Sequence, residues 1–307
     1  MILVTGGSGF LGKRVCRQLE AARVPYIQTS LKSGLDLRDR SATLNFFKKH
    51  RPDVVLNCAA FVGGIQFGLR RPAEIFSNNL RITLNLLEAA SQQSVKRIVN
   101  PISNCAYPAR ATFFKECEFW DGPLHESVMV YGAVRKISWV GAWAFAKQHD
   151  LDVINLILSN MYGPEDHFEE ERSHALGALI MKIVEAKRSG AESVTVWGSG
   201  KPVREWLHVD DGAEAMIRAI DVTPLIDPIN IGVGKGISIW DLALLIKEIV
   251  GYTGELILDT SKADGAPFKT VDGRLGAQHF GWSPCRDFRQ GVSDAIAWYE
   301  KNGGQCV

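Results

Sequence analysis

The first half of the chain alternates between two hydrophobic patterns. Short apolar runs rich in β-branched residues are typical of buried strands, and longer segments with apolar residues three and four positions apart are typical of amphipathic helices. The runs predict strands at 2–5, 26–29, 53–57, 97–102 and 152–158. The spaced segments predict helices at 10–22, 42–50, 73–91 and 131–149. Strands that alternate with helices predict an α/β fold, a Rossmann-type doubly wound parallel sheet covered by helices on both faces.

The pattern becomes more mixed after Pro164. Helices are predicted at 176–187, 239–250 and 288–301, and a strand at 193–197. We therefore expect 1–163 to form the Rossmann domain and 164–307 to form mainly a smaller α/β C-terminal domain for the substrate. The segment around 207–231 is expected to return to the first domain.

Composition and charge argue against several classes of protein, namely those that bind nucleic acid, bind metal or span a membrane. The 307 residues are 46% hydrophobic and carry a formal net charge of +1, which gives no general attraction to nucleic acid or to an anionic membrane. The six cysteines include no Cys-x-x-Cys pair, so neither a metal site nor a disulfide framework is indicated. No apolar run approaches the roughly eighteen residues of a membrane span, and no leader segment precedes the first strand. We expect a cytoplasmic protein with no metal, nucleic-acid or membrane partner.

A glycine-rich turn follows the first predicted strand and opens the first predicted helix. It reads GGSGFLG at 6–12. Glycine permits a tight turn and lets backbone N–H groups approach a pyrophosphate, whose charge the helix N-terminus stabilises. In this context the motif predicts a dinucleotide-binding domain, and a glycine turn without a ligand is the alternative. The residues expected to hold the dinucleotide are Gly6, Ser8, Gly9, Phe10, Leu11 and Gly12.

The end of the second predicted strand bears on the choice of cofactor. It reads QTSLK at 28–32, with no acidic residue to bind the ribose 2′-hydroxyl of NAD. Lys32 is placed to attract a 2′-phosphate, although a solvated loop charge explains it nearly as well. NADP(H) is therefore favoured, with NAD(H) as the alternative.

Two further segments carry residues suited to carbonyl chemistry. The sequence SNCAYP at 103–108 follows a predicted strand, and Tyr131 begins a predicted helix with Arg135 four positions later. That spacing places both side chains on one face of the helix. Tyrosine has an ordinary pKa of about 10, so it needs a neighbouring cation to work as an acid near neutral pH. We expect Tyr131 to donate a proton to a carbonyl oxygen that Ser103 also contacts.

These segments resemble the GDP-L-fucose synthase family, and the resemblance extends along essentially the whole chain. The matching segments are VTGGSGFLG at 4–12, AAFVGGI at 59–65, SNCAYP at 103–108, SNMYGPEDHF at 159–168, SHAL at 173–176, VWGSG at 196–200, REWLHVDD at 204–211 and the segment 264–269. The AAFVGGI stretch and the combination of Cys105 with His174 are more specific than a general dehydrogenase signature.

The resemblance implies an extended short-chain dehydrogenase/reductase that epimerises a GDP-linked 4-keto-6-deoxyhexose at C3 and C5 and then reduces it at C4. Cys105 and His174 match the family's acid–base pair, and a thiolate base requires a lowered pKa, which an imidazolium can supply. Taken singly, Cys105 is typical of a small buried residue and His174 of a polar helix start. The implied catalytic set is Ser103, Cys105, Tyr131, Arg135 and His174.

The same resemblance implies binding residues and an assembly. Implied cofactor contacts are Lys32, Asp36, Leu37, Ala59, Ala60, Val62, Tyr131 and Arg135. Implied substrate contacts are Asn160, Lys182, Trp197, Arg204 and Lys269. Trp197 is suited to stacking on the guanine or ribose, while each basic residue is equally well explained as a solvated surface charge. A homodimer is implied through the helices predicted at 73–91 and 131–149, whose apolar content also fits plain core packing.

Arg135 is the main departure from the family, which places a lysine there. Arginine keeps the positive charge, but its planar guanidinium fits a different space from an ammonium. Lys136 lies about 100° further round the helix and is a poor replacement. The sequence leaves three hypotheses: a GDP-sugar epimerase/4-keto-reductase, a redox-neutral GDP-sugar isomerase (an epimerase or a pyranose/furanose mutase), and a non-catalytic sugar-nucleotide-binding protein. The presence of the full catalytic set argues against the third.

Overall fold

The computed structural model describes residues 1–169, 173–262 and 264–303. Its main sheet has six strands in the order β2-β1-β3-β4-β5-β9, and all neighbours are parallel. The strands are β1 (Ile2–Thr5), β2 (Tyr26–Thr29), β3 (Val54–Asn57), β4 (Arg97–Ser103), β5 (Asp152–Leu158) and β9 (Ile229–Ile231). The predicted doubly wound fold is confirmed. The strand order reverses between β1 and β3, and such a switch point forms a ligand crevice at the carboxyl ends of the strands.

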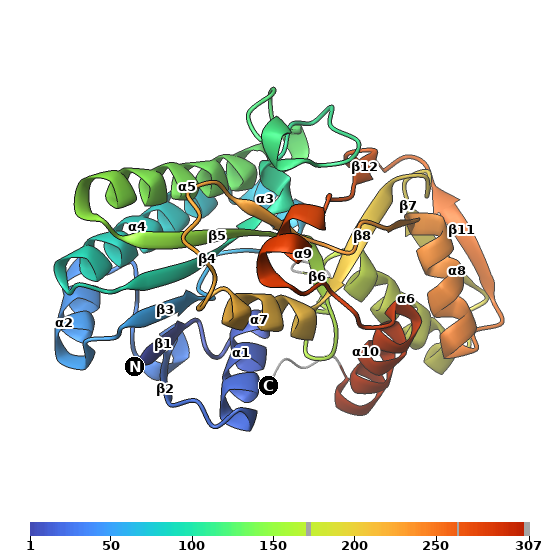
Figure 1. Cartoon of the computed structure of the whole chain (residues 1–307). Helices are drawn as coiled ribbons and strands as arrows, with labels where there is room; N and C mark the ends of the chain where they lie inside the picture. Colours follow the sequence, from blue (N-terminus) through green and yellow to red (C-terminus); the bar gives the residue numbers. More distant parts are fainter. Residues whose placement is uncertain (170–172, 263, 304–307) are drawn as a thin grey trace.

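Helices cover both faces of this sheet (Figure 1). One face carries α1 (Phe10–Ala21) and α7 (Val209–Arg218), and the other carries α2 (Arg40–His50), α4 (Pro72–Gln92) and α5 (Met129–His149). The apolar stripe of α1 buries Leu11, Val15 and Leu19, which fixes its orientation on the sheet. Helix α2 begins at Arg40, earlier than predicted, because the Asp39 carboxylate accepts a hydrogen bond from Ala42 N–H and caps the helix.

A row of buried polar side chains crosses the main sheet from β1 to β5. Thr5 Oγ1 donates to Asn57 Oδ1 at 2.7 Å, and Asn57 Nδ2 donates to Asn100 Oδ1 at 2.9 Å. Asn100 Nδ2 in turn donates to Asn155 Oδ1 at 3.0 Å. A buried amide without its partner costs free energy, so this row favours one register of the four strands.

The remaining elements form a smaller unit, on the right in Figure 1. Helices α6 (Ala175–Ser189), α8 (Ile239–Val250) and α10 (Phe288–Asn302) share a hydrophobic cluster that contains Ile180 and Ile246. Strand β7 (Ser193–Trp197) pairs with β11 (Glu255–Asp259) in parallel. A second sheet is centred on β8 (Val203–His208) and includes β6 (Asn160–Tyr162), β10 (Gly236–Ser238) and β12 (Phe268–Lys269). The short helices α3 (Ile65–Arg70) and α9 (Arg274–Phe280) follow β3 and β12.

The chain passes between the two parts more than once. After β8 it enters α7, whose residues pack with those of α1 in one hydrophobic cluster, and β9 then pairs with β5. It leaves again for β10 and α8, and α9 contacts β9 before α10 packs against α6. These crossings bring the ends of β4, β6, β8 and β12 near one another, which positions the site described below. None of the described helices is long and apolar enough to cross a bilayer.

Candidate active site

The glycine-rich turn lies at the switch point of the sheet. Gly6 has φ +64°, and a Cβ there would lie 2.6 Å from the backbone of Cys58, which follows β3. A Cβ on Gly12 would overlap the carbonyl oxygen of Gly6. The turn therefore packs backbone against backbone, as a dinucleotide cradle requires. Leu11 is buried beneath it, while Ser8 and Phe10 stay partly accessible and Gly9 is exposed.

The segment after β3 forms the other wall of this cradle. Ala59 is partly accessible and Ala60 is exposed, and Val62 is 41% exposed. Leu37 is buried, whereas the Asp36 carboxylate is bound by Arg38 at 2.7 Å. The Cys58–Ala59 backbone therefore lies against the glycine-rich turn, and Asp36 already has a charged partner.

A cavity of about 470 Å³ lies between α1 and the end of β2. Its lining includes Lys32, as predicted, together with Lys13 and Arg17 from α1. Ser30 and Ser33 add hydroxyl groups, and Glu20 is its only acidic lining residue. Sequence reasoning missed Lys13 and Arg17, because a basic pair four positions apart on a helix also describes a solvated face. The cavity is suited to a phosphate group.

Tyr131 and Arg135 lie one turn apart on α5 and contact each other. Arg135 Nη2 donates to the Tyr131 hydroxyl at 3.1 Å, and the guanidinium carbon lies 4.9 Å from the centre of the tyrosine ring. Arg135 is buried, and its Nε makes no hydrogen bond within the part of the chain that the structure describes. The cation therefore adjoins the phenol, and one of its donors is buried without a hydrogen-bond partner among the described residues.

Lys136 points away from Tyr131. Its ammonium donates to the backbone carbonyl of Phe119 and lies 4.4 Å from the centre of the Trp120 ring. Burial lowers the pKa of Lys136. Lys136 does not replace the family's lysine, in agreement with its angular position on the helix.

Cys105 lies in the turn between β4 and α5. Its backbone N–H donates to Ser103 Oγ at 3.2 Å, so the Ser103 side chain caps the short turn that carries Cys105. Lys269 Nζ, from β12, donates to Cys105 Sγ at 3.3 Å. Lys269 is 8% exposed, so a buried ammonium adjoins the thiol. The sequence placed Lys269 among the substrate residues and gave no sign of this contact.

His174 caps the N-terminus of α6 without a side-chain hydrogen bond to the helix. The residue as a whole is accessible to solvent, but desolvation of the imidazole by the surrounding protein lowers the pKa of His174 to about 4, with smaller effects from the charges of Lys269 and His167. A pKa in this range leaves the imidazole neutral at pH 7. The cation at hydrogen-bond distance from the Cys105 thiol is Lys269.

Arg204 lies beside Lys269 in the second sheet, where the two residues are register partners of β8 and β12. Burial lowers the pKa of Arg204, and the nearby Cys105 and Asp264 raise it. Asp264 also binds the turn after β7, where its carboxylate accepts from Ser199 N–H at 2.9 Å and from Ser199 Oγ at 2.6 Å. Arg204 and Lys269 thus place two cations near Cys105.

The other predicted substrate residues flank this cluster. Lys182 Nζ lies 4.2 Å from the centre of the Trp197 ring, and Trp197 is 42% exposed. The two side chains form one cation–aromatic unit on α6 and β7. Asn160 Nδ2 donates to the carbonyl oxygen of Glu205 at 3.1 Å, which joins β6 to β8.

Glu205 is a buried carboxyl that sequence reasoning left without a role. It accepts from Ser159 Oγ at 2.6 Å, Val233 N–H at 2.6 Å and Val271 N–H at 2.9 Å. Burial raises the pKa of Glu205, although these hydrogen bonds oppose the rise. The residue ties β8 to the segments after β5, β9 and β12, so it holds the strand that carries Lys269. Only its position in the REWLHVDD motif hinted at this function.

No group of three or more His, Cys, Asp or Glu side chains suited to a metal ion occurs within 1–169, 173–262 and 264–303. The cysteines in these ranges are free, and Cys306 lies outside the described residues.

Comparisons with known proteins cover both parts of the fold. Residues 2–232 match the model of the NAD dependent epimerase/dehydratase family. The chain is 37% identical over 304 residues to the "Probable GDP-L-fucose synthase 1" of Oryza sativa subsp. japonica, covering 98% of this chain and 92% of that protein. Its structure resembles a GDP-6-OMe-4-keto-L-xylo-heptose reductase from C. jejuni, with a TM-score of 0.91, 25% identity, and coverage of 98% and 97% of the two chains. It also resembles an NADP-bound GDP-L-fucose synthetase from Naegleria fowleri, with a TM-score of 0.88, 28% identity, and coverage of 98% and 93%.

Proposed function

Because this chain belongs to the NAD-dependent epimerase/dehydratase family, as a relative of the GDP-L-fucose synthases, we propose that it uses NADP(H) to epimerise and then reduce a GDP-linked 4-keto-6-deoxyhexose. The observation that carries this proposal is the 3.3 Å contact between Lys269 Nζ and Cys105 Sγ. Reduction of a ketone needs a hydride and a proton donor. A thiol beside a buried ammonium adds a base suited to removing a proton from carbon.

The cofactor part of the proposal rests on the crevice at the switch point. The glycine cradle admits a pyrophosphate, and the end of β2 carries no acidic residue to select NAD. Lys13, Arg17 and Lys32 line the adjoining cavity, where a 2′-phosphate would gain charged hydrogen bonds. When bound, NADPH would supply the hydride for the reduction.

Cys105 and its neighbours are the residues proposed to catalyse epimerisation. A 4-keto group acidifies the C–H bonds at C3 and C5, because the resulting carbanion is delocalised as an enolate. Cys105, as a thiolate beside Lys269, takes such a proton, and the enolate is then protonated from the opposite face of the ring. Lys269, as an ammonium, and His174 are the groups proposed to return that proton, and His174 must first take up a proton itself because its imidazole is neutral at pH 7.

Residues at the start of α5 are proposed to assist the reduction at C4. Tyr131 donates its hydroxyl proton to the oxygen at C4, and Arg135 stabilises the phenolate that remains. Ser103 Oγ donates a hydrogen bond to the same oxygen. Arg204, Lys182 and Trp197 are proposed to hold the GDP moiety.

A redox-neutral GDP-sugar isomerase is the second candidate, and Arg135 is the observation that favours it. If the guanidinium does not support proton donation from Tyr131, epimerisation by Cys105 would proceed without net reduction. Incubation in deuterated water tests the shared first step. The proposal expects deuterium at C3 and C5 of a GDP-4-keto-6-deoxyhexose, whereas a product without deuterium at these positions would contradict epimerisation by either candidate and leave only a pyranose/furanose mutase.

We also propose that the protein forms a homodimer through α4 and α5. Leu84 on α4 is 51% exposed, and Ile137, Val140 and Trp143 on α5 are 42%, 43% and 44% exposed. The two helices lie side by side on the outer face of the main sheet (Figure 1). Burial of such an apolar surface against a second copy would stabilise the pair.

A further inference from the structure

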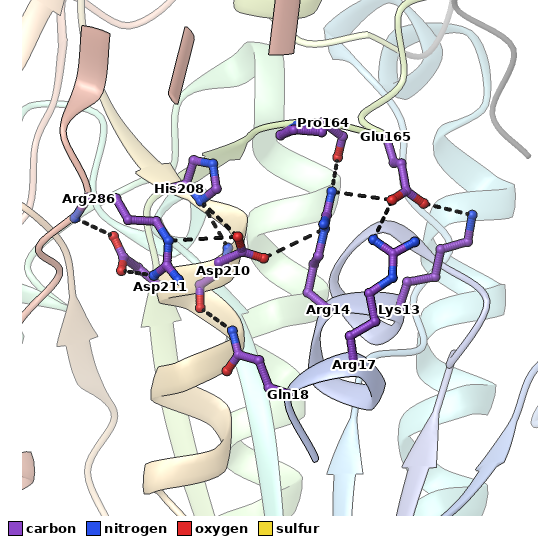
Figure 2. A network of polar contacts seen from close by, with 10 residues as sticks. All are labelled: Lys13, Arg14, Arg17, Gln18, Pro164, Glu165, His208, Asp210, Asp211 and Arg286. Carbon is purple, nitrogen blue, oxygen red and sulfur yellow. Dashed lines mark hydrogen bonds and ion pairs between the residues drawn. The ribbon is translucent and has the colours of Figure 1, made fainter. Parts of the chain in front are cut away.

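Three cationic side chains of α1 converge on one carboxylate that follows β6. Arg17 Nη1 lies 2.6 Å, Lys13 Nζ 3.2 Å and Arg14 Nη2 3.3 Å from the Glu165 carboxylate oxygens. Figure 2 shows the three chains pointing from the helix toward Glu165. The Glu165 side chain is only 12% exposed, so its carboxylate is largely shielded from water where the three cations contact it. The contact joins the first turns of the cofactor helix to the connection between β6 and α6.

The connection around Glu165 is held in one conformation. Glu165 has φ +69°, a left-handed conformation that is uncommon for a residue other than glycine. Arg14 Nη2 donates to the carbonyl oxygen of Pro164 at 2.7 Å, which fixes the residue before it. Burial raises the pKa of Glu165, but hydrogen bonds from Arg17 and Lys13 outweigh it and hold that pKa below its usual value. Glu165 is therefore an anion at neutral pH.

The three cations differ in what they adjoin besides Glu165. Lys13 and Arg17 line the cavity beside the end of β2, and Arg14 does not. Arg14 Nε instead lies 3.7 Å from Asp210, which also lies 3.7 Å from Arg286, as Figure 2 shows. Arg14 is thus held by the carboxylates of Glu165 and Asp210 inside the protein. Lys13 and Arg17 contact Glu165 and also line a cavity suited to phosphate.

We infer that Glu165 is a specificity-determining residue for the cofactor, because it engages the two cations that a ribose 2′-phosphate would use. A phosphate monoester carries a charge of about −1.5 to −2 at pH 7, more than a carboxylate, so it draws Lys13 and Arg17 toward the cavity. This movement weakens their ion pairs to Glu165, and the loss reduces the net free energy gained when the phosphate binds. The 2′-hydroxyl of NAD(H) is uncharged and does not draw these cations away from Glu165. Glu165 therefore lowers the affinity for NADP(H) and leaves that for NAD(H) unchanged.

This inference rests on the proposed use of NADP(H), and direct binding separates the two. We would titrate the wild-type protein and Glu165→Gln with NADPH, NADH and 2′,5′-ADP in a calorimeter at low salt. Glutamine keeps the size of the side chain and removes its charge. Roughly fivefold tighter binding of NADPH and of 2′,5′-ADP is expected, with NADH binding within a factor of two of the wild type.

Two matched variants complete the experiment. Glu20→Gln removes another carboxylate that lines the cavity and has no ion pair to Lys13 or Arg17 among the described residues, so it should shift NADPH binding by less than Glu165→Gln. Arg17→Gln should weaken NADPH and 2′,5′-ADP binding and spare NADH. Unchanged NADH binding shows that each variant is folded.

The contradicting outcomes are distinct. Weaker NADPH binding in Glu165→Gln would show that Glu165 positions the cations for phosphate rather than competing for them. An equal change for NADPH and NADH, or an equal change in both glutamine variants, would show a general effect of charge. Wild-type protein that binds neither dinucleotide would overturn this inference together with the cofactor assignment.

Discussion

The chemistry open to Cys105 depends on the charge beside its thiol. Lys269 is the buried cation at hydrogen-bond distance from the thiol, and its charge also contributes to the lowered pKa of His174. A thiolate gains stability from such a cation and loses it when the cation is removed. The proposed base, Cys105, can therefore be tested together with Lys269.

Replacing Cys105 by serine should abolish epimerisation while sparing cofactor binding. A serine hydroxyl is a far weaker acid than a thiol, so it provides no base near neutral pH. We expect deuterium exchange at C3 and C5 to fall by at least about 100-fold, a typical contribution of a general base. Proton NMR of the substrate in deuterated water measures the exchange. Full exchange in Cys105→Ser with normal NADPH affinity would exclude Cys105 as the base.

Lys269→Met should slow the exchange while sparing NADPH binding. The methionine fills the space of the lysine but removes the hydrogen bond and the positive charge beside the Cys105 thiol. We expect the rate of exchange to fall by roughly tenfold, about the contribution of one charge-assisted hydrogen bond. Lys201→Met, at an exposed lysine next to β8, is the control and should leave the exchange unchanged. Exchange at the wild-type rate in Lys269→Met would contradict a function of Lys269 beside the base.

Arg135 should be needed for reduction and not for exchange. Its guanidinium donates to the Tyr131 hydroxyl and stabilises a phenolate there. We expect Arg135→Met to lower NADPH oxidation by about 100-fold and to leave deuterium exchange within a factor of three. Arg135→Lys should retain reduction, because an ammonium supplies the same charge. Equal losses in exchange and reduction would indicate a structural defect.

Sequence reasoning identified the residues of this site better than their contacts. Tyr131 and Arg135 were paired correctly because a helix fixes the distance between positions four apart. The contact between Lys269 and Cys105 was missed because 164 positions separate the two residues. Glu205 was missed for the same reason, since its partners follow three other strands. Contacts between distant segments depend on the tertiary fold, which no local pattern encodes.

At the scale of elements, long helices and strands were predicted closely and short strands were not. Helix α5 begins at Met129 and β4 ends at Ser103, within two residues of the predicted limits. Strands β6, β9 and β12 have three, three and two residues, too few to show a period of two. Helix α7 was missed although Asp210 and Asp211 occupy its first turn, a common helix-start signal.

The connection between β6 and α6 should make stability depend on pH. Burial raises the pKa of Asp166 to about 7, the Glu169 carboxylate adds to the rise, and the N–H of His167 opposes it. The unfolded chain releases this proton near pH 4 and the folded chain near pH 7. The stability due to Asp166 is therefore complete below about pH 4 and is lost as the pH rises to 7.

Asp166→Asn removes this titration and should raise the free energy of unfolding at pH 8 by on the order of 2 to 4 kcal/mol. The gain over the wild type should fall to about 1 kcal/mol at pH 4.5 and vanish below about pH 4. Urea unfolding at both pH values measures it, with Asp227→Asn, at an exposed carboxylate, as the control. A gain that is the same at both pH values would contradict the assigned titration.

At the scale of the whole molecule, the outer face of α4 and α5 predicts the assembly. Replacing Val140 and Trp143 by glutamate would place charges in the proposed interface and should convert a dimer into a monomer in sedimentation equilibrium. Leu244→Glu introduces a charge at an exposed apolar position of α8, outside this face, and should leave the dimer intact. A wild-type monomer at micromolar concentration would contradict the proposal.

We propose that one site carries out both epimerisation and reduction. NADPH absorbance, followed while GDP-4-keto-6-deoxymannose is converted and the products are separated by chromatography, tests this most directly. We expect one NADPH to be consumed for each molecule of a reduced GDP-6-deoxyhexose that differs in configuration at C3 and C5. A new GDP-sugar isomer formed with no net consumption of NADPH would contradict this proposal and would show that the protein is a redox-neutral isomerase.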